Sequence, residues 1–118
     1  MIIYIRSWRT WLFISYLLCI IYLSITPANE LPFLAHLWKN DKIIHFTEYF
    51  ILGFLLINLF MIKPVTRNIR IFSIIFLLLF PVVDEIFQYY TPTRIPDIFD
   101  CIADICGGFT GFYLRKNI

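Results

Sequence analysis

The apolar residues of this chain form four long blocks. They run over residues 10–26, 43–62, 69–90 and 98–114. Each block is near the roughly 20 residues that a helix needs to cross about 30 Å of hydrocarbon, although the first and last are short. Only helices and closed barrels satisfy the backbone in a bilayer, and no block alternates apolar and polar residues as a barrel strand does. The pattern therefore predicts an all-α, integral membrane four-helix bundle.

Prolines mark the breaks between the blocks, because a proline disfavours helix at the residue before it. Pro27 follows the first block, Pro64 follows the second, and Pro92 and Pro96 separate the third from the fourth. No internal repeat or separate polar region divides the chain. We therefore expect one membrane domain over residues 1–118.

The composition narrows the class of protein further. Hydrophobic residues make up 60% of the chain and charged residues only 15%, whereas about a quarter of a soluble domain is charged. No phosphate loop, dinucleotide fingerprint or basic-aromatic surface occurs, so we expect no nucleic-acid partner. Cys19, Cys101 and Cys106 lie in apolar blocks and are odd in number. They are interpreted as packing residues rather than as a disulfide framework or a zinc site.

The basic residues are unevenly divided between the two ends of the predicted bundle. Seven of the ten would lie at one end: Arg6, Arg9, Lys63, Arg67, Arg70, Arg115 and Lys116. By the positive-inside rule, both termini of a multi-pass protein in a bacterial cytoplasmic membrane are then cytoplasmic. No small-x-small cleavage site follows the first block, so we interpret that block as a retained span and not as a signal peptide.

The acidic residues gather at the opposite end, where antiparallel helices bring three polar segments to one depth. Ionisable groups inside spanning helices are costly, and they usually pair with one another or mark function. The candidate ligand-binding residues at this depth are Asp41, Lys42, His45, Glu48, Tyr49, Asp84, Glu85, Gln88, Arg94, Asp97, Asp100 and Asp104.

Some of these residues also have a purely structural interpretation. Asp41 and Asp97 each stand where they could cap a helix, and Lys42 could simply extend its ammonium to the interface. Arg94 would offset negative charge by holding two carboxylates, or would instead hold a phosphate group of a ligand. A binding or catalytic site is favoured for the residues a turn or more inside the blocks: His45, Glu48, Asp84, Glu85, Gln88 and Asp104.

Two chemistries remain open, because so many carboxylates cannot all stay ionised at close range without a cation or shared protons. One is a divalent cation, with His45, Asp84, Asp100 and Asp104 as the candidate ligands. The other is a proton-sharing network around a polar headgroup. The sequence leaves open whether the chain is an enzyme; the catalytic candidates are His45, Glu48, Asp84 and Glu85.

The fourth block contains a seam of small residues. Gly107 and Gly111 stand four residues apart, with Ala103 four residues before Gly107. This spacing lets a helix pack closely against its neighbours. The alternative is a homo-oligomer through Gly107 and Gly111.

The polar residues fall into two ordered motifs. The first is Asp41-Lys42-x-x-His45-x-x-Glu48-Tyr49-x-x-Leu52-Gly53, and the second is Asp84-Glu85-x-x-Gln88-x-x-x-Pro92-x-Arg94-x-x-Asp97-x-x-Asp100-x-x-Ala103-Asp104-x-x-Gly107. Together they resemble the VanZ-like family from Asp41 to the C-terminus, and the first block fits the same plan. The chain departs from the family at Thr93, where glycine is common, and at 81–83, where small or hydroxyl residues are frequent.

The resemblance implies a fold and a cell-envelope setting, but no reaction. The family is similar to a membrane protein linked to low-level resistance to the glycopeptide teicoplanin, and most members have no established biochemical activity. We therefore expect a membrane protein that binds a polar envelope ligand at the outer leaflet, such as a lipid-linked headgroup or a peptidoglycan precursor. The alternatives are a metal-assisted hydrolase or transferase acting on lipid or envelope precursors, and a small transporter or flippase.

Overall fold

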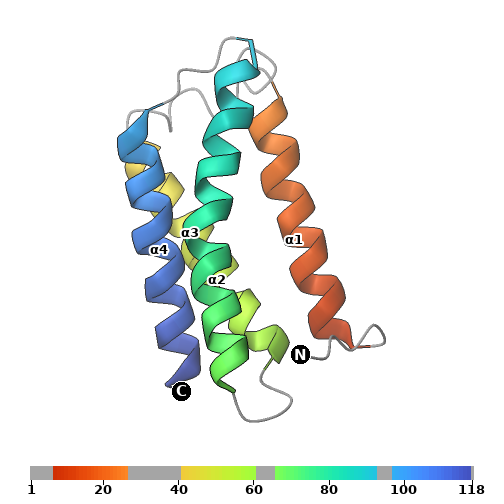
Figure 1. The fold of residues 1–118 in the computed structure, drawn as a ribbon. Helices are drawn as coiled ribbons and strands as arrows, with labels where there is room; N and C mark the ends of the chain where they lie inside the picture. The colour runs from red at the N-terminus through yellow and green to blue at the C-terminus, as the bar shows by residue number, and fades with distance from the viewer. Residues whose placement is uncertain (1–6, 27–40, 61–65, 93–96, 118) are drawn as a thin grey trace.

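The computed structural model describes residues 7–26, 41–60, 66–92 and 97–117, which form four helices. They are α1 (Trp8–Ile25), α2 (Asp41–Phe60), α3 (Arg67–Tyr90) and α4 (Ile98–Lys116). The helices run alternately up and down (Figure 1), so α1 begins and α4 ends at the same end of the bundle. We call this the terminal end and the opposite one the distal end. The predicted all-α four-helix bundle is confirmed.

Side-chain caps explain where three of the helices begin. The side chains of Ser7, Thr66 and Asp97 accept hydrogen bonds from backbone N–H groups in the first turns of α1, α3 and α4. Asp97 therefore has the capping role that its position suggested. α2 begins at Asp41 rather than at residue 43, so the first polar motif belongs to the helix from its first residue.

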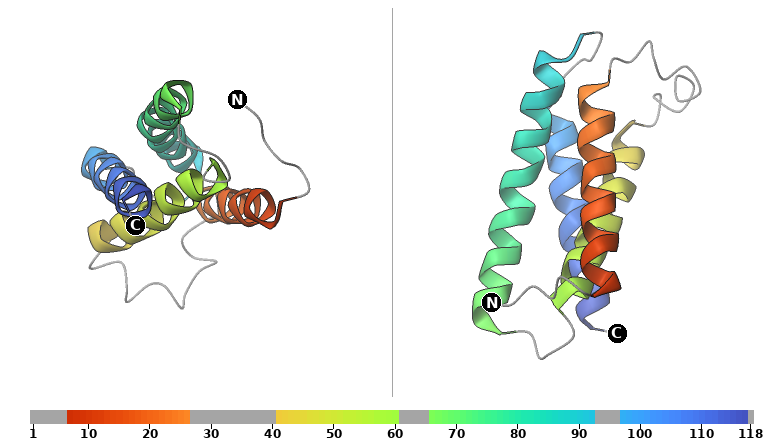
Figure 2. Two further views of the ribbon diagram at one scale, coloured as in Figure 1. Left: turned by 90° about the horizontal axis from the view of Figure 1, so that it is seen from below. Right: turned by 90° about the vertical axis from the view of Figure 1, so that its right-hand side faces the viewer.

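The closest packing in the bundle joins α2 to α4, which lie side by side in Figure 2. A Cβ atom on Gly107 would stand 2.2 Å from the backbone oxygen of Phe46, and one on Gly111 would stand 1.9 Å from that of Phe50. Only glycine permits this approach of two backbones. The glycine seam thus packs against α2 of the same chain, and an oligomer through Gly107 and Gly111 stays a prediction.

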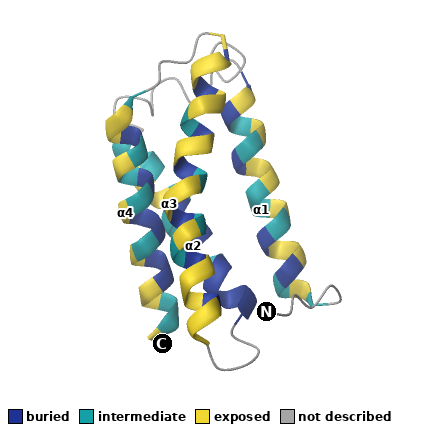
Figure 3. Cartoon of the chain, viewed as in Figure 1, coloured by how far each residue is buried: buried dark blue, intermediate teal, exposed yellow. Residues whose placement is uncertain are grey.

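The surface of the bundle is apolar on many sides, whereas its interior at the distal end is polar. Trp8, Tyr90 and Ile98 are each more than 60% exposed, and exposed positions follow the outer faces of the helices in Figure 3. Soluble monomers rarely expose so much apolar surface. α1 and Lys42–Phe60 of α2 are also long and apolar enough to cross a membrane. These features indicate membrane association.

Candidate polar site at the distal end

His45 of α2 lies between two carboxylates of α4. Its Nδ1 donates to Oδ1 of Asp104 at 2.7 Å, and its Nε2 lies 3.5 Å from Oδ2 of Asp100. The two carboxylates are buried one helical turn apart on the face of α4 that continues into the glycine seam. The close approach of α2 and α4 therefore brings them to the ring. The arrangement matches the two N–H donors of an imidazolium.

Lys42 extends this contact between α2 and α4 toward the end of the bundle. Its Nζ donates to Oδ2 of Asp97 at 2.8 Å and to Oδ1 of Asp100. The Lys42 ammonium, and after it the backbone N–H of Phe99, lower the pKa of Asp97 below its ordinary value. Lys42 binds these carboxylates while its side chain remains partly exposed.

Asp84 of α3 accepts hydrogen bonds from hydroxyl groups on two other helices. The Tyr49 hydroxyl of α2 donates to Oδ2 at 2.9 Å, and the Ser24 hydroxyl of α1 donates to Oδ1. All three side chains are buried. Asp84 thus joins α1, α2 and α3 in one polar network, which lies beside the contact between His45 and α4.

Two buried carboxylate oxygens, Oε2 of Glu85 and Oδ2 of Asp104, have no hydrogen-bond partner among the described residues. The other oxygen of Glu85 accepts from the backbone N–H of Asp97 at 2.6 Å, and that of Asp104 accepts from His45. Buried polar atoms are nearly always paired, and leaving one unpaired costs about 1–3 kcal/mol. These two oxygens are acceptor positions that a ligand's donor would satisfy.

A groove of about 400 Å³ runs between α3 and α4 beside this cluster. The residues that line it are Val82, Glu85, Ile86, Tyr89, Asp97, Ile98 and Cys101. Most of its wall is apolar, and Val82, Ile86 and Ile98 are also exposed on the outer surface. The groove therefore connects the apolar exterior with the Glu85 carboxylate.

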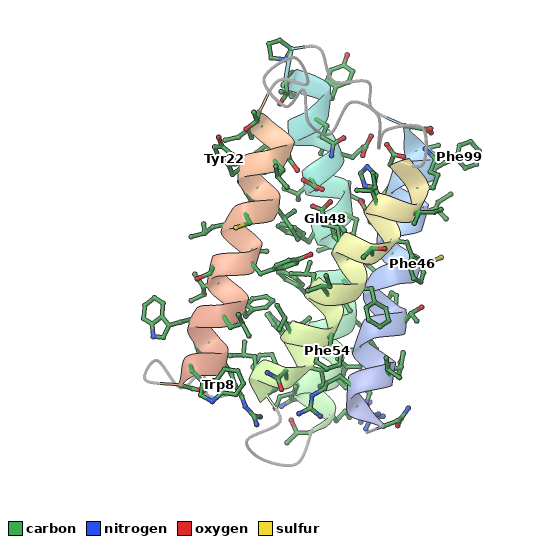
Figure 4. The ribbon with its side chains drawn as sticks, turned by 180° about the vertical axis from the view of Figure 1, so that it is seen from behind. Trp8, Tyr22, Phe46, Glu48, Phe54 and Phe99 are labelled. Atoms are coloured by element: carbon green, nitrogen blue, oxygen red, sulfur yellow. The ribbon has the colours of Figure 1, made fainter. Side chains whose placement is uncertain are left out.

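The other predicted site residues fall into two groups. Glu48 is half-buried and projects from α2 on the side where α1 lies (Figure 4), while Gln88 is buried one turn beyond Asp84 on α3. Arg94 and the side chain of Asp41 lie outside the described residues.

Two residues of α1 belong to the site but were missing from the candidates. The Tyr16 hydroxyl donates to the backbone oxygen of Glu48 at 2.6 Å, and Ser24 donates to Asp84. Ser24 lies on the buried stripe of α1 with Phe13 and Ile20. A polar residue at helical spacing from buried apolar ones was the available signal.

The candidate metal ligands are divided between two networks. His45 contacts Asp100 and Asp104, whereas Asp84 is held by hydroxyl groups of α1 and α2. In the described parts of the chain, no group of three or more His, Cys, Asp or Glu side chains could hold a metal ion. The arrangement does not favour the metal-assisted alternative.

The apolar exterior and the carboxylates buried at one end define an all-α four-helix bundle that associates with a membrane. Comparison with protein families matches residues 13–118 to the family described as VanZ/LLP1, and the chain therefore belongs to the VanZ-like family. The match includes most of α1, beyond the two motifs that carried the resemblance. Neither the search of curated proteins nor that of solved structures found a match.

Proposed function

We propose that the chain binds the polar headgroup of an amphiphilic envelope molecule, such as a lipid-linked precursor, at the distal end. The observation that carries this proposal is the buried Oε2 of Glu85 at the wall of the α3–α4 groove, which has no hydrogen-bond partner in the described part of the chain. An apolar chain lying in the groove would bring a headgroup donor to this oxygen. The groove supplies the apolar contact, and the carboxylate supplies the polar one.

The charge of the site favours a headgroup rich in hydrogen-bond donors. Among the described residues at the distal end, carboxylates outnumber the basic side chains, which are Lys42 and His45. Carboxylates accept hydrogen bonds from hydroxyl, amide and ammonium groups, and such charge-assisted bonds are among the stronger ones. A lipid-linked sugar carries these groups. A link to teicoplanin resistance stays a prediction from the family resemblance.

The binding proposal is tested with Glu85→Gln, which keeps the shape of the side chain and removes its charge. The probe is a polyprenyl pyrophosphate that carries an N-acetylated amino sugar, and polyprenyl phosphate without a sugar is its comparison. We expect the variant to bind the sugar-bearing lipid about tenfold more weakly, because a charged acceptor is lost. Native mass spectrometry of the purified protein in detergent measures both affinities.

Two further variants separate the headgroup from the apolar chain. Cys101→Trp fills the groove, so we expect it to weaken the binding of both lipids. Thr110→Val changes an exposed polar residue of α4 outside the groove, so it should bind both as the wild type does. Unchanged binding of the sugar-bearing lipid by Glu85→Gln would contradict the proposal.

We also propose that all four helices span a bacterial cytoplasmic membrane, with the terminal end in the cytoplasm. The support is the uneven charge, because Arg9, Arg70 and Arg115 lie at the terminal end and the described acids lie toward the distal end. Ser7→Cys and Asn117→Cys, in a chain without its native cysteines, would both be protected from an impermeant maleimide in intact cells. Labelling of either one from outside would refute this orientation.

A further inference from the structure

Two guanidinium groups meet at one residue near the terminal end. Nη1 of Arg9, from α1, donates to the backbone oxygen of Asn58 at 3.2 Å. Nε and Nη2 of Arg115, from α4, donate to Oδ1 of the same asparagine at 3.2 and 3.1 Å. Asn58 is 6% exposed and lies in the last turn of α2. Helices that are far apart in sequence thus place two positive charges around one asparagine.

Aromatic rings hold both guanidinium groups in place. Arg9 lies over the Trp8 ring at 5.4 Å from its centroid, and Arg115 lies over the Phe54 ring at 5.7 Å. Cation–π contacts of this kind, together with the hydrogen bonds to Asn58, restrict the two long side chains. The pair is therefore ordered before any ligand binds.

The positive charge of this pair is not balanced within the described structure. Neither Arg9 nor Arg115 forms an ion pair with a carboxylate among the described residues. Arg9 uses one of its N–H groups and Arg115 uses two, whereas a guanidinium carries five. Most of these donors therefore make no hydrogen bond to a described residue, and an anionic ligand could use them.

We propose that Arg9 and Arg115 form a binding site for the phosphate group of an anionic glycerophospholipid. Planar guanidinium groups match phosphate oxygens in pairs. The depth of the site selects a lipid, because Trp8 and Trp11 are both exposed in the first turns of α1, where aromatic residues mark the membrane interface. This site is at the opposite end from the proposed headgroup site and does not depend on it.

The probe is phosphatidylglycerol, compared with phosphatidylcholine that has the same acyl chains. Native mass spectrometry of the protein in detergent measures the affinity for each lipid. We expect a preference of about tenfold for phosphatidylglycerol, and Arg9→Gln and Arg115→Gln should each remove most of it. Arg67→Gln is the matched control, since it removes one exposed charge at the same end without touching Asn58. It should keep the preference.

A fourth variant separates loss of the site from loss of folding. Asn58→Asp keeps the shape of the side chain and supplies a carboxylate to the Arg115 guanidinium, next to the backbone oxygen that Arg9 contacts. We expect it to abolish the preference for phosphatidylglycerol while the protein unfolds at the same or a higher detergent concentration. Loss of the preference for phosphatidylglycerol without loss of stability would support the proposed lipid site.

Three results would overturn the proposal. One is an equal loss of preference in Arg67→Gln, which would reduce the effect to overall surface charge. Another is an unchanged preference in Asn58→Asp. The third is full displacement of phosphatidylglycerol by inorganic phosphate at millimolar concentration, which would make the site one for a free anion.

Discussion

Gly107 and Gly108 are neighbours on α4, yet the structure predicts opposite tolerance of alanine at the two positions. An alanine Cβ at Gly107 would stand 2.2 Å from the backbone oxygen of Phe46, so α4 would have to move by about 1.2 Å to reach an ordinary contact of about 3.4 Å. At Gly108 the nearest atom is Cδ2 of Leu77 at 3.1 Å. That atom is the end of a flexible side chain, so a shift of only a few tenths of an ångström would relieve the contact.

These contacts set the size of the effect. Overpacking lowers stability by about 1–3 kcal/mol. For Gly107→Ala we expect the upper end of this range, because the contact is with a backbone atom that cannot move independently. At either position, the higher helix propensity of alanine relative to glycine offsets about 1 kcal/mol of this cost. We therefore expect Gly107→Ala to lower the free energy of unfolding by about 2 kcal/mol and Gly108→Ala to change it by less than about 0.5 kcal/mol.

The assay is unfolding of the protein in mild detergent by added dodecyl sulfate, followed by far-ultraviolet circular dichroism. Gly107 also lies one turn after Asp104, whose carboxylate is 2.7 Å from His45. A displaced α4 would lengthen that hydrogen bond, and the imidazole signals in a nitrogen NMR spectrum would report it. Equal stability of the two variants, or a less stable Gly108→Ala, would refute the packing of α4 against α2 described above.

Further substitutions test the polar network by the same unfolding assay. Tyr49→Phe removes the donor to Oδ2 of Asp84 and should cost about 1–3 kcal/mol, whereas Tyr22→Phe, on an exposed residue, should have almost no effect; equal effects would contradict the buried bond. Asp97→Ala should destabilise the protein through loss of the cap, and Asp97→Asn, which can still cap α4, should destabilise it less. The pKa of Asp97 is lowered in the folded protein, with Lys42 as the main cause. Its contribution to stability is therefore complete above the unfolded pKa and is lost as the pH falls through the lowered one. Asp97→Asn should reduce this loss of stability at low pH. The same pH dependence of stability in the variant and the wild type would contradict this role of Asp97.

Much of the fold could be predicted from the sequence, because long apolar blocks and prolines are local signals. The four blocks correspond to the four helices, and α3 ends at Tyr90, as its pattern indicated. The pairing of helices was less accessible. Glycines showed that α4 packs closely, but only the assembled bundle shows that its partner is α2.

The candidate site also has features that the sequence could predict and features that only the assembled bundle shows. Asp100 and Asp104 stand at helical spacing on a buried face, so their shared orientation followed from the sequence. Ser24 did not stand out, because it is a small hydroxyl residue in an apolar block and its partner lies 60 residues away. The same distance in sequence hid the contact between Asn58 and Arg115, which are 57 residues apart.

The glycine seam also divides the helices around the groove into a closely packed pair and a more loosely packed neighbour. α2 and α4 meet backbone to backbone, and this closely packed pair carries both His45 and its two carboxylates. α3 contacts α2 only sparsely and forms the other wall of the groove. A shift of α3 would widen this groove without moving His45, but it would have to lengthen the hydrogen bonds that Asp84 and Glu85 form with the other helices.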